Sequence, residues 1–330
     1  MSQSTFVCDP SVWTAAHYPA SRRWVRTLSP DGLGELDAAV ASARRAGVAY
    51  WRLTPKTFPL PSLAETLSAS LRDLEEGPGF AVLGGFPVER YDRAETLLAY
   101  AGICSHLGSV TAQTHLGDRV IEVTDLRKPY DHTSRGYHSN KLLPFHTDGA
   151  DYVGLLCLGV AARGGSSVLA SAGAVHDMVL RERPDLYEVL RRGFRHHRRG
   201  EEAPGEPPVS IERIPVFAFH DGLLHCMYNR NPIEWVQKEG CRLSACELEA
   251  LDFLDDVLAR PGVALHMDLQ VGDIQFVNNL SVLHSRTEFE DDEEHRRRLL
   301  RLWISNPAAR RRGPTLLDLY NPEAARKARD

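Results

Sequence analysis

Apolar side chains recur with a helical period in the first quarter of the chain. Two stripes, with members three or four residues apart, are formed by Leu33, Leu36, Val40 and Ala43 and by Leu63, Leu67, Leu71 and Leu74. Stripes of this kind are typical of amphipathic helices whose apolar face packs on a core. We therefore predict that residues 1–75 form a helical flank beside the main core.

Beyond residue 77 the pattern changes to short apolar runs that end in turn residues, which is typical of strands. Strands are predicted at residues 80–83, 119–124, 142–145 and 152–158, and a hairpin at 216–228. Helical periods return at residues 93–107, 174–192 and 243–258, where Ser244 and Glu247 have the spacing of a capping box. This mixture predicts a single α+β domain over residues 1–330, with a surface tail at 306–330.

Composition places the chain among ordinary globular proteins. It has 330 residues, of which 43% are hydrophobic and 25% charged, and a net charge of −5. A mildly acidic chain does not favour a nucleic-acid partner, and no apolar segment has membrane-spanning length. Six cysteines without paired metal spacing, and a start without signal-peptide character, predict a cytoplasmic protein. A homo-oligomer is compatible with this composition.

Histidine and aspartate occur in the order His-x-Asp at two places, His146 with Asp148 and His266 with Asp268. The first pair ends an apolar run and enters a glycine-containing turn. One side chain is then fixed by a strand and the next lies on the loop that leaves it, as a metal site at the mouth of a barrel requires. The second pair lies within an alternating segment and is interpreted as the solvated face of a strand. We therefore take His146 and Asp148 as the functional pair.

A late histidine, His284, completes a set of two imidazoles and one carboxylate. Such a set occupies one face of an octahedral iron(II) ion and leaves the opposite face open. Arginines follow at positions 296–298 and 301. An arginine there can hold the far carboxylate of a 2-oxoacid that chelates the metal. The pattern points to iron-dependent oxygen chemistry.

Five blocks of sequence together resemble the taurine dioxygenase-like (TauD/TfdA) family of iron(II)/2-oxoglutarate-dependent oxygenases. They lie at residues 143–148, 164–167, 272–279, 283–287 and 297–303. The resemblance implies a double-stranded β-helix, or jelly roll, over about residues 77–305, with flanking helices and a metal at its open end. It also implies iron(II), 2-oxoglutarate and dioxygen, and oxidation of a small-molecule C–H bond with release of succinate and carbon dioxide. Hydroxylation is the expected outcome, and desaturation, epoxidation and ring formation are the alternatives.

The resemblance further assigns individual residues. The iron ligands are matched by His146, Asp148 and His284. Arg297 matches the arginine that pairs with the side-chain carboxylate of 2-oxoglutarate, and Ser167 stands where the family often has a threonine on that carboxylate. Arg301 matches a position used for an acidic group of the substrate or cosubstrate. Because strand residues alternate, Arg297, Leu299 and Arg301 share one face, and we expect Arg298 to point outward.

Polar segments near these blocks are candidates for substrate contact. Residues 127–141 lie directly before the predicted strand that leads to His146. There they either cover the substrate cavity or form a surface loop. The residues expected to contact an anionic or amino-acid-like substrate are Arg135, Tyr137, His138, Tyr228 and Arg301. By contrast, residues 195–208 are dense in charge, proline and glycine, and are predicted to form a solvated or disordered loop in spite of the His196-His197 pair.

Two other functions fit part of the pattern. A cupin-type metal dioxygenase or isomerase would keep the barrel and the metal but would not need the arginines at 297 and 301. A non-catalytic ligand-binding barrel would not require all three metal ligands. The leading interpretation of the sequence is an iron(II)/2-oxoglutarate-dependent oxygenase.

Overall fold

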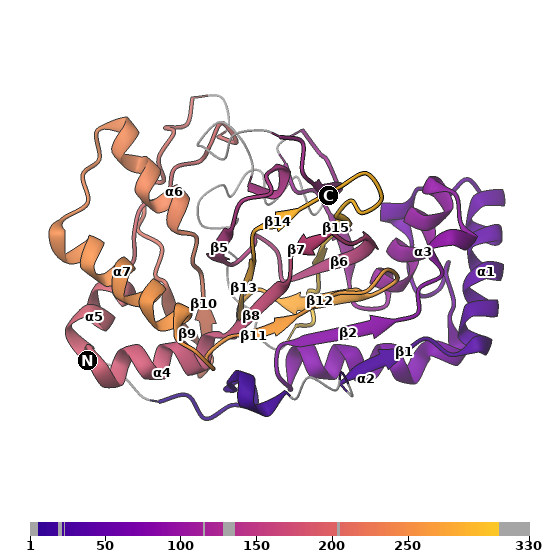
Figure 1. Ribbon diagram of the computed structural model, residues 1–330, viewed down its shortest axis with the longest axis horizontal. Coiled ribbons are helices and arrows are strands. Elements are labelled where there is room, and N and C mark those ends of the chain that lie inside the picture. Colours follow the sequence, from indigo (N-terminus) through magenta and orange to yellow (C-terminus); the bar gives the residue numbers. More distant parts are fainter. Residues whose placement is uncertain are drawn as a thin grey trace.

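The computed structural model describes residues 6–18, 22, 24–114, 116–127, 136–202 and 205–309, apart from the side chain of Tyr137. Within these residues, helices cover two β-sheets (Figure 1). The predicted surface tail lies outside the described residues from position 310 onward, as does Arg135. Among the described residues, none of the helices combines the length and the apolar character that a bilayer crossing requires.

The structure confirms the mixture of helices and strands that the sequence predicts. The helices are α1 (Pro30–Arg45), α2 (Ala64–Glu75), α3 (Arg93–Ser105), α4 (Ala172–Glu182), α5 (Pro184–Arg192), α6 (Arg230–Trp235) and α7 (Ala245–Ala259). Single 3₁₀ turns are η1 (Ala15–His17), η2 (Tyr50–Arg52), η3 (Pro61–Leu63), η4 (Val88–Arg90), η5 (Gly136–His138) and η6 (Val236–Glu239). The strands are β1 (Val25–Thr27), β2 (Phe80–Gly84), β3 (Ser109–Thr111), β4 (Val120–Thr124), β5 (Leu143–His146), β6 (Tyr152–Gly159), β7 (Arg163–Gly164), β8 (Ser167–Ser171), β9 (Phe217–His220), β10 (Leu223–Cys226), β11 (Leu265–Met267), β12 (Ile274–Asn278), β13 (Val282–Arg286), β14 (Phe289–Glu290) and β15 (Arg298–Ser305).

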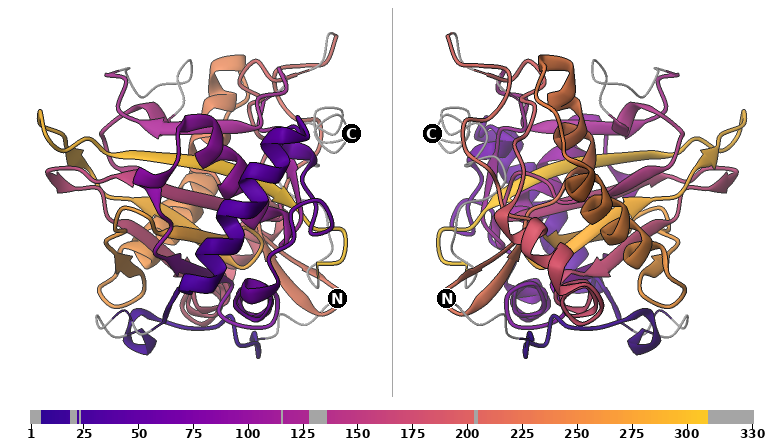
Figure 2. Two further views of the ribbon diagram at one scale, coloured as in Figure 1. Left: turned by 90° about the vertical axis from the view of Figure 1, so that its right-hand side faces the viewer. Right: turned by 90° about the vertical axis from the view of Figure 1, so that its left-hand side faces the viewer.

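Most strands form a larger and a smaller sheet, and β9 with β10 and β7 with β14 form two further two-stranded sheets. The larger sheet has the order β1-β2-β12-β6-β15-β3, with β4 also paired to β15, and the smaller has the order β11-β8-β13-β5. Helices α1, α2 and α3 pack on the larger sheet, and α4, α5 and α7 pack on the side of the smaller one (Figures 1 and 2). The chain therefore has four layers, with the two sheets in the middle.

The space between the sheets holds an apolar core of its own. Phe80 and Val277 of the larger sheet share this core with Leu169 of the smaller one. Phe276, next to Val277 on β12, belongs instead to the core under the helices, because successive strand residues point to opposite faces. Both faces of the larger sheet are thus covered, which explains its continuous apolar runs.

Local sequence signals set several element boundaries as predicted. Ser244 accepts a hydrogen bond from the Glu247 main chain at the start of α7, and the reciprocal bond completes the capping box. The hairpin β9–β10 turns at Asp221 and Gly222, which both have positive φ, as a tight two-residue hairpin turn requires. One element in the flank was missed. Strand β1 pairs in parallel with β2, and a run of three residues is too short to show a strand period.

Strand β6 approaches helix α3 very closely at Gly154. A Cβ atom placed there would lie 2.5 Å from the Tyr100 hydroxyl and 3.1 Å from the Phe276 ring. Both side chains are fully buried, so neither has room to move away. The absence of a side chain at position 154 therefore sets the distance between helix and sheet.

We predict that Gly154→Ala lowers the free energy of unfolding by about 1–3 kcal/mol, because the new methyl group overpacks this contact. Gly34→Ala is the matched control. Gly34 lies on the exposed face of α1 with nothing within 4 Å of its added Cβ, so this change should stabilise the protein by up to about 1 kcal/mol. Urea denaturation measures both, and equal effects at the two positions would contradict the packing argument.

Candidate metal centre

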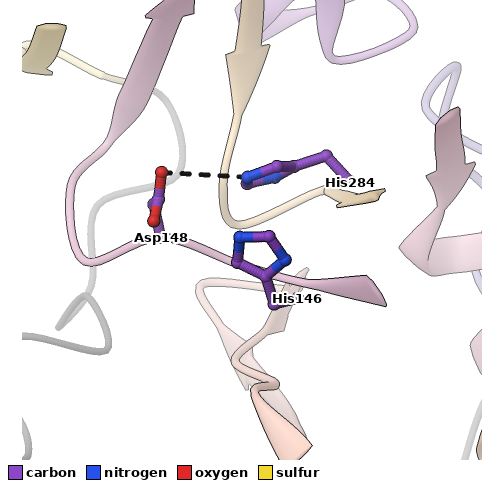
Figure 3. Close-up of side chains that lie close together, drawn as sticks. All are labelled: His146, Asp148 and His284. Atoms are coloured by element: carbon purple, nitrogen blue, oxygen red, sulfur yellow. Dashed lines mark ion pairs between the residues drawn. The ribbon is translucent and has the colours of Figure 1, made fainter. Parts of the chain in front are cut away.

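Two strands of the smaller sheet bring a pair of imidazoles together. Strand β5 ends at His146, which lies directly opposite His284 of the antiparallel strand β13. Directly opposed residues point to the same face, and the two ring centroids are 4.3 Å apart. Asp148 follows on the turn that leaves β5, and its carboxylate oxygen lies 3.7 Å from Nε2 of His284. One ligand-type atom from each of the three side chains lies within 4.8 Å of the others (Figure 3).

The main chain determines which nitrogen of His146 is available to a metal. Nδ1 lies 2.9 Å from the carbonyl oxygen of Pro144. A carbonyl only accepts hydrogen bonds, so Nδ1 carries the proton and Nε2 keeps its lone pair. A neutral imidazole with one lone pair is the form that binds a metal.

The three groups hold the protonation states that a metal needs. Burial is the main cause that lowers the pKa of both histidines. For His284 the neighbouring His146 imidazole adds to the effect of burial, and its pKa falls to about 3. Burial alone would raise the pKa of Asp148, but the Arg301 guanidinium and the two imidazoles outweigh it and bring that pKa to about 2. Two neutral nitrogens and one carboxylate are therefore present together, which fits a divalent cation.

Side chains from β15 hold the carboxylate of Asp148. Trp303 donates its indole N–H to Oδ2 at 3.1 Å, and Nη1 of Arg301 lies 3.3 Å from both oxygens. The Asp148 main-chain N–H donates to the side-chain oxygen of Asn279 at 3.1 Å. Donors of this kind orient a metal-binding carboxylate and tune its charge.

Arg297 and Arg298 differ in the way that strand alternation predicts. Arg297 is 6% exposed, whereas the Arg298 side chain is 46% exposed and pairs with Glu122. Nε of Arg297 donates to the carbonyl of Gly165 at 3.1 Å, but its buried Nη1 has no hydrogen-bond partner among the described residues. Burial and the nearby charge of Arg286 lower its pKa to about 9. A buried donor without a partner is costly, and a carboxylate would satisfy it.

Ser167 lies two residues after Gly165, whose carbonyl accepts from Arg297. It sits on β8 directly opposite Arg286 of β13, and its hydroxyl donates to the buried Gln275 at 2.9 Å. A cavity of about 550 Å³ adjoins Arg297 and Leu299 and is otherwise lined by residues of the 157–166 and 268–271 segments. Arg297 lines this cavity, whereas none of the three metal-centre side chains does.

The residues expected to bind substrate differ in how near they lie to the metal centre, and the side chains of two of them lie outside the described residues. Arg301 lies at the centre, against Asp148. The Tyr228 ring is fully buried, and its hydroxyl donates to Asp255 of α7 at 2.7 Å. The contact of Tyr228 with the His146–Asp148 turn is made by its main-chain carbonyl, which accepts from Thr147. His138 belongs to η5, shortly before β5. Arg135 and the Tyr137 side chain lie outside the described residues.

The prediction of a loop at 195–208 holds for the described residues, but the prediction that it is solvated was wrong for residues 196–198 and 201, which are buried. His196 is 1% and Arg198 4% exposed. The segment is held by a bridge between His197 and Val209, and Arg198 pairs with Glu206 at 2.7 Å. Charged side chains can be buried when they pair with one another, and such pairing leaves no apolar period in the sequence.

The same segment carries a residue that sequence reasoning missed. Burial is the main cause of the lowered pKa of His146, but the positive charge of Arg199 adds to it, as it does for His196. The charge of this arginine therefore acts on one imidazole of the metal centre. No motif marks Arg199 in the sequence.

Comparisons with known proteins agree with this geometry. A model of the family described as "Taurine catabolism dioxygenase TauD, TfdA family" matches residues 47–303. FR-33289 synthase of Streptomyces rubellomurinus (strain ATCC 31215) is 34% identical over 322 residues, which cover 95% of this chain and 94% of that protein. The taurine hydroxylase-like protein SAT17 of Stachybotrys chartarum (strain CBS 109288 / IBT 7711) is 32% identical over 313 residues, 89% of this chain and 78% of that protein.

The fold is also shared with solved structures. An asparagine oxygenase in complex with Fe(II), 2S,3S-3-hydroxyasparagine and succinate superimposes with a TM-score of 0.62 at 19% identity, over 86% of this chain and 94% of that one. The fold and the three converging donors define a non-haem iron oxygenase. The chain belongs to the TauD/TfdA family and is an iron(II)/2-oxoglutarate-dependent dioxygenase.

We predict that metal binding at pH 6.5 releases less than one proton. At that pH two ordinary imidazoles would together release about one proton, since 6.5 is their usual pKa, but the pKa of His284 is lowered to about 3 and that of His146 is lowered too, so fewer protons remain to be displaced. Calorimetric titration of the metal-free protein with manganese(II), in two buffers of different ionisation enthalpy, should give heats that differ by less than the ionisation of one proton. A difference that corresponds to one proton would show that the rings titrate normally.

Proposed function

We propose that His146, Asp148 and His284 bind iron(II). The convergence of their ligand atoms, all within 4.8 Å of one another, is the observation that carries this proposal. Two neutral imidazoles and one carboxylate leave the ion a net positive charge, which favours an anionic chelator on its open face. When bound, iron(II) supplies the oxidation of a substrate C–H bond by dioxygen, coupled to the conversion of 2-oxoglutarate to succinate and carbon dioxide.

We propose that Arg297 and Ser167 hold the far carboxylate of 2-oxoglutarate. The support is the buried, unpartnered Nη1 of Arg297 and the position of Ser167 two residues after Gly165, whose carbonyl accepts from Arg297. Arg301, which already contacts Asp148, is proposed to meet an acidic group of the cosubstrate or substrate beside the metal. A cupin-type enzyme that does not use 2-oxoglutarate would give no reason for a buried arginine with an unmet donor.

We propose an anionic or amino-acid-like small molecule as the substrate. Positive charge reaches the centre from Arg301 and from Arg199, which favours an acidic group on the substrate. The related asparagine oxygenase is seen with a hydroxylated amino acid, and hydroxylation is the reaction we propose. Further substrate contacts are proposed for His138 and Tyr228, and also for Arg135 and Tyr137, whose side chains lie outside the described residues.

We propose that the two sheets form a double-stranded β-helix within one domain. The layering of β6, β12 and β15 against β8 and β13, with a shared apolar core between them, supports this architecture. The helical flank at residues 1–75 then closes the outer face of the larger sheet. The cytoplasmic location and the oligomeric state remain predictions.

Succinate release tests the proposed reaction directly. The protein, supplied with iron(II) and 2-oxoglutarate, would be screened against amino acids and against small carboxylates, sulfonates and phosphates. Under labelled dioxygen we expect one labelled oxygen in succinate and one in a hydroxylated product. Succinate without label would overturn the proposed reaction, whatever the product.

We predict that His146→Ala, Asp148→Ala and His284→Ala each lower turnover by about 100-fold or more, because loss of a direct ligand exceeds the effect of losing a supporting residue. His266→Ala is the matched control, since His266 is exposed on β11 and should leave activity nearly unchanged. Iron content and turnover of the four variants provide the measurement. A larger loss at 266 than at 146 would mean that the wrong His-x-Asp pair was chosen.

We predict that Arg297→Ala weakens 2-oxoglutarate binding by about 30- to 1000-fold, since a buried arginine–carboxylate pair contributes about 2–4 kcal/mol. Arg298→Ala removes an exposed ion pair with Glu122 and should change the affinity by less than about fivefold. Titration of 2-oxoglutarate against both variants compares them. The opposite order of effects would show that the inward arginine is at position 298.

A further inference from the structure

The ring of Phe289 is contacted by two buried arginines. The guanidinium of Arg286 lies 4.7 Å from the ring centroid, and that of Arg297 lies 5.5 Å from it. All three side chains are 6% exposed or less. Two like charges in a buried place repel each other strongly, and the electron-rich ring face offsets part of that repulsion. The position of each guanidinium thus depends on the same ring.

Arg286 donates its hydrogen bonds to a different part of the chain from Arg297. Its Nη1 donates to the carbonyl of Ser139 at 2.7 Å, and its Nη2 donates to the carbonyl of Lys141. Both acceptors belong to the segment that directly precedes β5, the strand that ends at His146. One arginine therefore faces that segment, while the other faces the proposed cosubstrate site.

Residues 286–290, from the end of β13 through β14, join these two regions through their main chain. On one side the Phe289 N–H donates to the carbonyl of Asn140 at 3.0 Å, and the Asn140 side chain donates back to the Phe289 carbonyl at 3.3 Å. On the other side β14 pairs with β7, where Gly164 precedes the Gly165 carbonyl that accepts from Arg297. The 286–290 segment thus lies between residues 139–141, which precede β5, and the Arg297 end of the site.

We propose that Arg286 is a positioning residue for the reaction. It clamps residues 139–141 with its hydrogen bonds and, through the Phe289 ring, holds the guanidinium of Arg297 against the cosubstrate carboxylate. The inference rests on the proposed role of Arg297 in binding 2-oxoglutarate. Arg286 acts on the site through residues 139–141 and through the ring that it shares with Arg297. Its charge also adds to the positive potential that attracts an anion.

Three variants separate charge from geometry. Arg286→Gln removes both the charge and the paired N–H donors. Arg286→Lys keeps the charge but loses the planar guanidinium with its paired donors. Phe289→Leu removes the aromatic ring that both arginines contact. Lys141→Gln is the matched control. It alters a side chain that links the same two segments, but only through an exposed ion pair with Glu288, which contributes little.

The measurement is an anaerobic titration of the iron(II)-loaded protein with 2-oxoglutarate, followed by the visible charge-transfer absorption of the complex. We expect Arg286→Gln to raise the dissociation constant about tenfold or more, and Phe289→Leu to raise it by at least about threefold. Arg286→Lys should keep the constant within about threefold of the unaltered protein, because the charge remains. Lys141→Gln should have no effect.

Hydrogen exchange of the same proteins reports on the clamp. Amide exchange in peptides that contain Lys141 and Phe289 should accelerate in both Arg286 variants, because each loses the paired hydrogen bonds, and should stay unchanged in Lys141→Gln. A purely structural role for Arg286 would accelerate exchange without changing 2-oxoglutarate binding in any variant.

The outcomes are distinct. If Arg286→Gln and Phe289→Leu both bind 2-oxoglutarate within about twofold of the unaltered protein, the inference is wrong. If Arg286→Gln does not fold, Phe289→Leu alone decides between the same two results. If the unaltered protein binds iron(II) but gives no 2-oxoglutarate-dependent absorption, the proposed function itself fails, and this inference fails with it.

Discussion

The register between β5 and β13 is the constraint on which the metal centre depends. His284 faces His146 because the two are directly opposed in an antiparallel pair. A slip of one residue would turn His284 to the other face of the sheet, where Leu283 now packs under α4 and α7. Burial of Leu283 on one side and of Val282 in the core between the sheets prevents that slip. Hydrophobic packing therefore fixes the geometry of a polar site.

The features that the sequence predicted well are those encoded over a few residues. The capping box at Ser244 and the turn at Asp221 depend on neighbours along the chain. The choice between the two His-x-Asp pairs also rested on local alternation, and His266 does lie exposed on β11. His284 was chosen from its late position before an arginine cluster, and the resemblance to a family added support, because no local rule connects His284 to a strand so far away in sequence.

The features that the sequence did not predict depend on partners that are distant along the chain. Strand β1 is recognisable only through its parallel pairing with β2. Burial of Arg198 requires Glu206 and the bridge at His197. The contact of Arg286 and Arg297 with one ring likewise joins two strands. Composition and periodicity describe a segment by itself, so they cannot report what packs against it.

The hydrogen bond from His146 to the Pro144 carbonyl has a consequence for how this site can evolve. Its acceptor is a main-chain atom, so no substitution of a single side chain removes it. The partners of Asp148, by contrast, are the side chains of Arg301 and Trp303, which mutation can replace one at a time. The electronic character of the centre is thus adjustable at its carboxylate and nearly invariant at this imidazole. Engineering of its reactivity should begin at positions 301 and 303.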